Sequence, residues 1–254
     1  MLFRSPTNNK TLLFLDQNRI GKFINKKLMR YPWYRNYKSG LKDDSTWPKM
    51  FPSKSDETNA QAVFTKMKTL HGDKRWYVTE KLEGQNISIV TQIKKVLWFN
   101  RVTVGVCSRT RFMPSYDGSQ FWKTVKNKEY DKKASAIGKN LFIRGEHVGP
   151  TIQACIYPFT ERDIYIFDVY ELDGKRMLSY MELVTFCISN GFKMVPVIDD
   201  DFRLPETVQE LLEYSNGYSV YGDKVLREGI VLRLVDDPKI SFKVRSPKYL
   251  AKKD

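Results

Sequence analysis

Short runs in which hydrophobic and polar residues alternate dominate the chain after residue 75, and this pattern predicts strands rather than long helices. The runs cover residues 75–81, 86–99, 101–108, 141–147, 164–170, 229–235 and 239–244. Helical stretches interrupt them without regular alternation of strand and helix. The order therefore predicts an α+β fold with antiparallel sheets rather than a doubly wound parallel fold.

The helices are predicted from the residues at their ends. Ser179 and Glu182 have the spacing of a capping box, which predicts a helix that Gly191 ends. Pro205 is predicted to open another helix that ends near Asn216. Further helical segments are expected over residues 20–29 and 59–70. Residues 121–139 are polar and lysine-rich, and are expected to form a helix and an exposed excursion.

The turn between the first two predicted strands carries a lysine in the sequence Lys81-Leu82-Glu83-Gly84. A glycine at such a turn allows close approach of the backbone to a neighbour or ligand. A lysine between two carboxylates in this position is a candidate covalent nucleophile. A solvated hairpin turn has the same local pattern, so the remaining motifs must decide between the two interpretations.

Composition and charge narrow the function classes. The chain has 254 residues, 41% of them hydrophobic, which is typical of a globular protein with a sizeable core. No apolar run approaches the roughly 20 residues of a membrane span, and the N-terminus lacks a signal-peptide layout. We therefore expect an intracellular, cytoplasmic protein, in the host cytoplasm if the source is viral. The net charge of +14 favours a polyanionic partner, for which nucleic acid is the best candidate.

Cysteine and histidine content excludes several kinds of site. The three cysteines are far apart and form neither a disulfide framework nor a zinc pattern, so buried free thiols are expected. Only two histidines are present, which excludes a three-histidine metal site. Residues 31–35 mix aromatic and basic side chains, which could stack on bases or pack a loop onto the core.

Polar residues stand at the ends of several other predicted strands. Glu146 follows Gly145, Glu228 precedes a glycine and a hydrophobic strand, and Arg109 follows Ser108. Each could be an ordinary charge at a strand end. Two further signals are an aromatic strand with one inserted acid and a pair of basic residues spaced to share one strand face. The aromatic strand carries Phe167 and the acid Asp168, and the basic pair is Lys243 and Arg245.

Taken in order, Lys-x-Glu-Gly, Ser-Arg, Gly-Glu, Phe-Asp, Glu-Gly-Ile-Val-Leu-Arg and Lys-x-Arg resemble motifs I, Ia, III, IIIa, IV and V of the covalent nucleotidyltransferases. This superfamily comprises ATP-dependent polynucleotide ligases and mRNA capping enzymes. Residues 80–86 and 145–150 are most similar to RNA ligases of the type-2, phage-like branch. The resemblance covers about residues 75–250. It implies the ligase adenylation-domain fold, with antiparallel sheets flanked by helices around an ATP cleft.

The resemblance also implies a domain organisation and a partner. We expect one adenylyltransferase domain over residues 1–254, of which 1–70 would be an N-terminal extension, and no C-terminal OB domain. The expected partner is RNA, or DNA, with 5′-phosphate and 3′-hydroxyl ends, and the expected state is a monomer without membrane association.

The family chemistry assigns a role to each motif residue. Lys81 would attack the α-phosphate of ATP to give lysyl-AMP, the AMP would pass to a 5′-phosphate end, and a 3′-hydroxyl would seal the strand. Phe167 would stack on adenine, while Glu146 and Arg109 would hold the ribose. The implied nucleotide-binding residues are Glu80, Leu82, Asn86, Arg109, Glu146, Phe167, Lys243 and Arg245. Mg²⁺ or Mn²⁺ would bind to Glu228 and Glu83.

Two positions depart from the family pattern. The usual acid of motif I is Asp, where this chain has Glu83, and the longer side chain shifts any contact it makes. The second basic residue of motif V is usually Lys, where this chain has Arg245, which keeps the charge but presents a planar fork.

Three alternatives to an ATP-dependent RNA ligase stay open on the sequence. A minimal DNA or mixed-end ligase would share motifs I to V, although typical DNA ligases add an OB domain after motif V. A capping guanylyltransferase would use GTP and normally needs the same extra domain. A nucleic-acid-binding protein with a ligase-like fold would keep the basic charge but form no covalent nucleotide adduct.

Overall fold

The computed structural model describes residues 19–28, 48, 51–52, 57–96 and 98–253. The chain divides into two compact units, residues 1–47 and 48–254. Within the first unit the described residues form helix α2 (Arg19–Leu28), which confirms the helix expected there. The aromatic and basic cluster at residues 31–35 lies outside the described residues.

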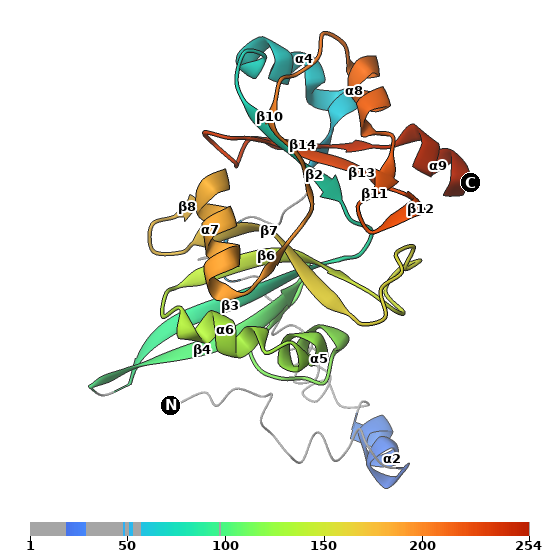
Figure 1. Cartoon of the computed structure of the whole chain (residues 1–254). Helices are drawn as coiled ribbons and strands as arrows, with labels where there is room; N and C mark the ends of the chain where they lie inside the picture. Colours follow the sequence, from blue (N-terminus) through green and yellow to red (C-terminus); the bar gives the residue numbers. More distant parts are fainter. Residues whose placement is uncertain (1–18, 29–47, 49–50, 53–56, 97, 254) are drawn as a thin grey trace. The chain divides into compact units, whose positions relative to one another are not determined.

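Two sheets make up most of the second unit (Figure 1). In the first sheet, sheet A, all neighbouring strands run antiparallel except the parallel pair β1 and β14. The strands of sheet A are, in spatial order, β1 (Thr58–Asn59), β14 (Ser241–Arg245), β13 (Gly229–Leu234), β2 (Trp76–Lys81) and β10 (Val197–Phe202).

The second sheet, sheet B, is built around one long hairpin. Its strands are antiparallel except for β9, which pairs in parallel with β7. In spatial order they are β5 (Phe112–Met113), β4 (Phe99–Ser108), β3 (Gln85–Val96), β6 (Leu141–Val148), β7 (Asp163–Glu171) and β8 (Arg176–Met177), with β9 (Lys193–Met194) beside β7. A small separate ribbon consists of β11 (Tyr218–Ser219) and β12 (Gly222–Leu226).

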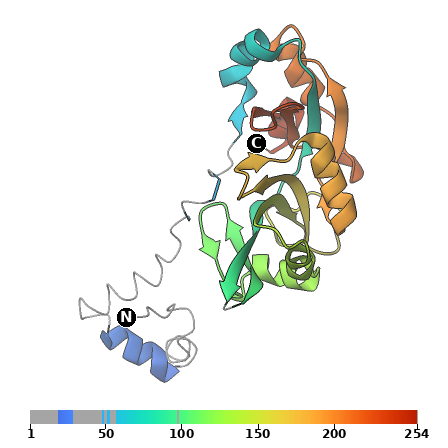
Figure 2. The same ribbon diagram turned by 90° about the vertical axis from the view of Figure 1, so that its left-hand side faces the viewer.

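Helices cover the outer faces of both sheets. Figures 1 and 2 show α4 (Ala60–His71) and α8 (Val208–Ser215) at one end of the unit and α5 (Gln120–Asn127) and α6 (Tyr130–Ala136) at the other, with the two sheets between them and α7 (Tyr180–Asn190) at their side. Of these helices, α4 and α8 lie on sheet A and α5, α6 and α7 on sheet B, followed by the C-terminal α9 (Pro247–Lys253). This arrangement confirms the predicted α+β class with antiparallel sheets. In the described part of the chain, no helix is long and apolar enough to cross a membrane.

Because successive residues of a strand point to opposite faces of its sheet, one face of each sheet packs in a hydrophobic core and the other can line a cavity. In sheet A, alternate residues such as Trp76, Val78 and Ile230 pack against α4 and α8 in one hydrophobic core. In sheet B, residues such as Ile87 and Ile143 pack against α5, α6 and α7 in another. Each such side chain contributes about 1.5–3 kcal/mol when fully buried. The intervening residues of both sheets therefore face the space between them.

Most predicted helix ends are confirmed, and one is wrong. Ser179 and Glu182 form the capping box, and Gly191 ends the helix at a positive φ of 65°. The prediction that Pro205 opens α8 is wrong, because Thr207 caps that helix through a second capping box with Glu210.

Two further details refine the sequence predictions. The segment 121–139, expected to hold a helix and an exposed excursion, forms two short helices, and Glu129 between them is left-handed with a φ of 55°. Cys107 and Cys187 are buried free thiols, as expected, and Cys155 is half-buried.

Candidate active site

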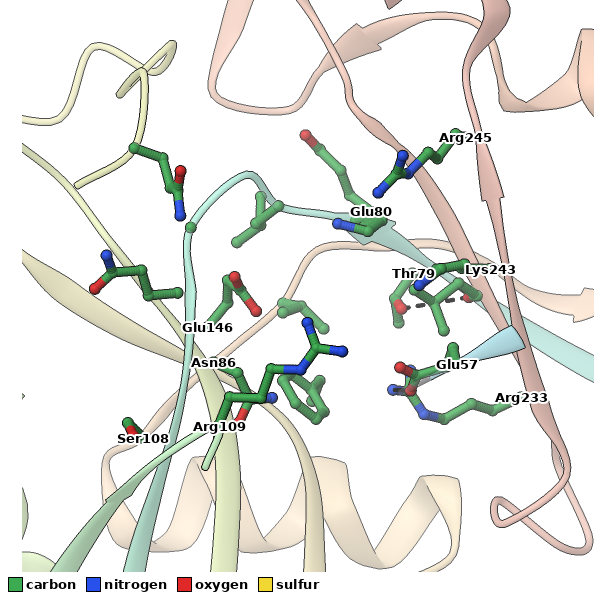
Figure 3. A pocket seen from close by; sticks show the side chains of 18 of the residues that line it. Glu57, Thr79, Glu80, Asn86, Ser108, Arg109, Glu146, Arg233, Lys243 and Arg245 are labelled. Atoms are coloured by element: carbon green, nitrogen blue, oxygen red, sulfur yellow. Dashed lines mark hydrogen bonds and ion pairs between the residues drawn. The ribbon is translucent and has the colours of Figure 1, made fainter. Parts of the chain in front are cut away.

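A cavity of about 470 Å³ lies between the two sheets (Figure 3). It gathers every residue predicted to bind the nucleotide, together with the predicted nucleophile Lys81. Those residues are Glu80, Lys81, Leu82, Asn86, Arg109, Glu146, Phe167, Lys243 and Arg245. The two predicted metal ligands lie elsewhere: Glu228 contacts Lys81 from beside the cavity, and Glu83 faces the C-terminal helix.

Sheet A supplies the cationic side of the cavity. Three neighbouring strands each contribute two residues at positions i and i+2, which share one face of the sheet. These pairs are Thr79 and Lys81 on β2, Val231 and Arg233 on β13, and Lys243 and Arg245 on β14. The predicted placement of Lys243 and Arg245 on one strand face is thereby confirmed.

Sheet B supplies the polar groups on the opposite side. Asn86 on β3 and Glu146 on β6 are direct cross-strand partners, so their side chains lie on the same face. Ser108 ends β4 and Arg109 follows it at the cavity. Figure 3 shows Asn86, Arg109 and Glu146 approaching the cavity from one side, and Lys243 and Arg245 from the other.

A β-bulge places Phe167 in the cavity wall. Arg144 on β6 pairs with Asp168 on β7, whereas the next residue, Gly145, pairs with Ile166, so Phe167 is an extra residue in its strand. Bulges of this kind redirect side chains and are frequent beside active sites. Asp168, the acid inserted in this aromatic strand, forms a buried ion pair with Arg144.

The Lys81 ammonium group forms an ion pair with Glu228, with 2.7 Å between Nζ and Oε2. The pair follows from strand register, because Lys81 lies directly opposite Gly229 in sheet A. The side chains are 24% and 12% exposed, so both remain partly accessible to solvent. A β-carbon at Gly229 would lie 2.1 Å from the carbonyl oxygen of Val244, which explains the glycine beside this acid.

Glu146 is the most strongly perturbed carboxyl of the cavity. Burial raises its pKa to about 8, the Lys81 ammonium opposes this rise, and the carboxylates of Glu228 and Glu57 add to it. Without a ligand, Glu146 is therefore largely protonated at neutral pH and can donate as well as accept a hydrogen bond. Perturbed acids of this kind concentrate at functional sites.

The turn after Lys81 is fixed by contacts with the protein itself. A β-carbon at Gly84 would lie 2.5 Å from the carbonyl oxygen of His147, so the close approach expected of this glycine is to the neighbouring strand. The amide of Glu83 donates to the Tyr157 hydroxyl at 2.7 Å. The Glu83 carboxylate accepts from Lys253 Nζ of α9 at 2.9 Å and does not line the cavity.

Glu57 and Arg233 are cavity residues that the sequence prediction did not include. Their side chains form an ion pair of 2.7 Å, in which the Arg233 side chain is only 3% exposed. Burial has the largest single influence and would raise the pKa of Glu57. The Arg233 guanidinium, a backbone hydrogen bond and the charges of Arg144 and Lys243 together lower that pKa below its usual value. Arg233 also lies 5.4 Å from the centre of the Phe167 ring. A charged residue inside the run Gly229–Leu234 was the available sequence signal for Arg233; Glu57 had none.

The predicted residue Glu80 and His147, the neighbour of Glu146, have mainly structural partners. Glu80 accepts a hydrogen bond from the Val220 amide at 3.0 Å, and burial raises its pKa. His147 is fully buried and shares a hydrogen bond of 2.8 Å with the Thr124 hydroxyl. Burial lowers the pKa of His147 to about 4, so its ring is neutral.

The carboxylates of Glu146 in the cavity and Glu228 beside it suit a cation that arrives with a ligand. Among the described residues, no group of three or more His, Cys, Asp or Glu side chains could hold a metal ion. Glu228 lies close enough to Glu146 for its negative charge to raise the pKa of Glu146. Mg²⁺ commonly binds through one or two carboxylates, with the remaining ligands from phosphate oxygens and water. The donor set fits that mode of binding.

Comparison with solved structures finds the same fold in the RNA ligase of Naegleria gruberi. A variant of that enzyme with ATP and Mn superposes with a TM-score of 0.72 at 26% identity, covering 82% of this chain and 60% of that one. Its structure with PPi gives 0.71 at 26% identity, with 82% and 59% covered. A variant with AMP and Mn gives 0.71 at 25% identity, with 82% and 60% covered.

This chain thus spans about 60% of the length of the Naegleria enzyme. A comparison with curated proteins finds no match. The profile of the family described as RNA ligase matches residues 74–250, which is well over half of the chain and includes the strands that carry Lys81, Glu146, Phe167 and Lys243. The chain belongs to the RNA ligase family.

Proposed function

We propose that this protein is an ATP-dependent RNA ligase that joins 5′-phosphate and 3′-hydroxyl ends through a lysyl-AMP intermediate on Lys81. The observation that carries the proposal is the position of Lys81 Nζ. It lies at a cavity that also presents an aromatic ring, four further basic side chains and Glu146. The Naegleria structures with ATP, AMP and PPi support the same ligand class.

The cavity offers a partner for each part of ATP. Phe167 presents an apolar ring on which adenine can stack. Asn86, Arg109 and Glu146 lie together at the sheet B side and can bind the ribose hydroxyls. Lys243 and Arg245 provide positive charge for the phosphates, and Arg245 can form paired hydrogen bonds to phosphate oxygens.

The first chemical step uses Lys81 as the nucleophile. Its amine, once deprotonated, forms a bond from Nζ to the α-phosphorus, and the bond from that phosphorus to the bridging oxygen breaks to release pyrophosphate. Lys243 and Arg245 offset the negative charge that develops on the phosphates. Glu228, which holds Lys81 Nζ at 2.7 Å, fixes the amine at the cavity wall before the reaction.

We propose Glu228 as a ligand of Mg²⁺ or Mn²⁺, which when bound would neutralise phosphate charge. Glu83 would join it only after leaving its ion pair with Lys253. Glu80 and Leu82 flank the nucleophile and would shape the nucleotide site from β2 and the turn.

The later steps require the RNA ends to bind at the mouth of the same cavity. The AMP group would pass from Lys81 to a 5′-phosphate, and attack by a 3′-hydroxyl would form the phosphodiester and release AMP. We assign these steps to one adenylyltransferase domain. It would include residues 57–70, because Glu57 lines the cavity and α4 packs on sheet A.

The test is sealing of a 5′-phosphorylated RNA by the purified protein with ATP and Mg²⁺. We expect a ligated product and an adenylylated RNA intermediate, and neither with Lys81→Ala. Parallel substrates with DNA at the 3′-hydroxyl end, or with GTP in place of ATP, separate an RNA ligase from a DNA ligase and a capping enzyme. Sealing that persists in Lys81→Ala would refute the proposal.

A further inference from the structure

The hairpin of β3 and β4 belongs to a long stretch without acidic residues. From Gly84 to Tyr116 the chain has no Asp or Glu but five basic residues. At the chain's average acid content, a stretch of this length would carry three or four acids. The basic residues are Lys94, Lys95, Arg101, Arg109 and Arg111.

Three of these cations lie together at the far end of the hairpin. Lys94 pairs with Arg101, and Lys95 with Asn100, in the register of β3 and β4. All three basic side chains are exposed, and none forms an ion pair with an acid in the described part of the chain. Figure 1 shows this end of the hairpin extending beyond the rest of sheet B. Exposed cations without acidic partners favour a polyanion.

Large aromatic side chains are exposed beside these cations. Trp98 is 86% exposed and Phe99 is 50% exposed. Tyr116, 55% exposed, lines a groove of about 660 Å³ between β4 and α5–α6 that Arg101 also lines. Exposed aromatics next to cations are the combination on which unpaired bases stack in single-stranded nucleic-acid sites.

The topology links this surface to the cavity. The short β5 pairs with β4 only at Val106 and Cys107, so the outer edge of β4 from Phe99 to Gly105 has no strand partner among the described residues. The same strand ends at Ser108, which lines the cavity. Seven residues separate Arg101 from Ser108, a distance of about 24 Å at about 3.4 Å per residue.

We propose that the basic ribbon, defined as Lys94, Lys95, Trp98, Phe99 and Arg101, binds a single-stranded segment of the RNA substrate. The segment would lie along β4 with one end at the cavity and an unpaired base stacked on Trp98. This inference rests on the proposed function, since it places the substrate of that reaction. Charge complementarity and the exposed indole favour RNA over a protein partner.

The test compares two triple variants of equal charge. Lys94→Ala/Lys95→Ala/Arg101→Ala removes the cations of the basic ribbon, and Lys66→Ala/Lys74→Ala/Lys224→Ala removes three exposed lysines elsewhere. Each is first assayed for covalent AMP formation with ATP and Mg²⁺ in the absence of RNA, and we expect both to match the unmodified protein. Binding of a 5′-phosphorylated single-stranded RNA is then measured over a range of salt concentrations.

We expect the ribbon triple variant to lower RNA affinity at least about tenfold. It should also reduce the slope of log K against log salt by about 2, because each lost phosphate contact on a single strand reduces that slope by about 0.7. The control triple variant should keep the slope. Trp98→Ala should lower affinity for single strands about 5- to 150-fold without changing the slope. It should leave affinity for a blunt RNA duplex unchanged.

Equal affinities and slopes for the two triple variants would overturn the inference, as would an equal effect of Trp98→Ala on duplex and single strand. Absence of AMP formation in the unmodified protein would instead refute the proposed function. The RNA-binding measurement remains interpretable in that case, because it needs no ATP.

Discussion

The cavity and the basic ribbon both collect charged residues, but they hold them in opposite ways. In the cavity, Lys81 pairs with Glu228 and Arg233 pairs with Glu57, and these side chains are largely buried. On the basic ribbon, Lys94, Lys95 and Arg101 are exposed and have no acidic neighbour in the stretch from Gly84 to Tyr116.

This difference separates two uses of charge. Paired, partly buried groups are screened little by salt and are expensive to disrupt, which suits a site that must hold reacting atoms in place. Exposed cations contribute little to stability and are sensitive to salt, which suits reversible contact with a polyanion. Substitutions in the cavity should therefore affect chemistry and folding, and those on the ribbon should affect RNA affinity.

The largest expected effect is loss of the nucleophile. Lys81→Ala should reduce covalent AMP formation by at least about 10³-fold, because removal of a nucleophile abolishes a covalent route. RNA affinity at low salt should stay within about threefold, since the basic ribbon is intact. Gel detection of labelled AMP and an RNA-binding assay measure the two effects. A loss of both together would break the distinction between cavity and ribbon.

The second largest effect concerns the buried ion pair. Glu57→Ala should lower the free energy of unfolding by about 3 kcal/mol, because it leaves the Arg233 guanidinium buried without its partner. Arg75→Ala is the matched control, since its 2.7 Å pair with Asp201 is exposed and should contribute less than about 1 kcal/mol. Chemical denaturation measures both. Equal losses for the two variants would contradict the assigned role of burial.

A smaller effect depends on pH. An unfolded Glu146 is ionised above pH 6.5, whereas the folded protein keeps it protonated up to about pH 8. The folded state therefore binds the extra proton, and stability falls as pH rises from 6.5 to 8, by up to about 2 kcal/mol. Glu146→Gln should remove that decline.

The contribution of His147 to stability has the opposite pH dependence, but it changes mainly below pH 6.5. Its pKa of about 4 in the folded state lies below the ordinary value of 6.5, so its contribution is lost only as pH falls through that range. Denaturation of the unmodified protein and Glu146→Gln between pH 6.5 and 8 therefore isolates Glu146. If the stabilities of the two proteins changed with pH in parallel, the Glu146 carboxyl would be ionised in the folded protein, contrary to the prediction.

The smallest effect is expected at Glu83. Glu83→Gln weakens the ion pair with Lys253, whose side chain is 57% exposed, so stability should change by less than about 1 kcal/mol. Because Glu83 does not line the cavity, AMP formation should stay within about tenfold of the unmodified protein. Lys253→Ala should change stability and AMP formation by equally small amounts. A loss of a hundredfold or more in Glu83→Gln alone would place its carboxylate at the reacting phosphates.

The sequence predicted those parts of the site whose chemistry is local. Lys243 and Arg245 alternate along one strand, so period-two geometry places them on one face. That Lys81 and Glu146 would join them at one site was implied by the order of the motifs, and all four line the cavity. The α+β class followed from the same short alternating runs.

The rest depended on partners distant in the chain. Glu57 pairs with a residue 176 positions away, and no local pattern marks it. Glu83 is turned from the cavity by Lys253, 170 positions away. The bulge that places Phe167 in the cavity wall arises from the pairing of β6 with β7, which alternation within one strand does not reveal.

The central claim is that Lys81 is the residue that carries AMP. The most direct measurement is mass spectrometry of the intact protein and its peptides after incubation with ATP and Mg²⁺ in the absence of RNA. The account predicts one added AMP, located on the peptide at Lys81 and absent from Lys81→Ala. No adduct, or an adduct on another residue, would contradict it.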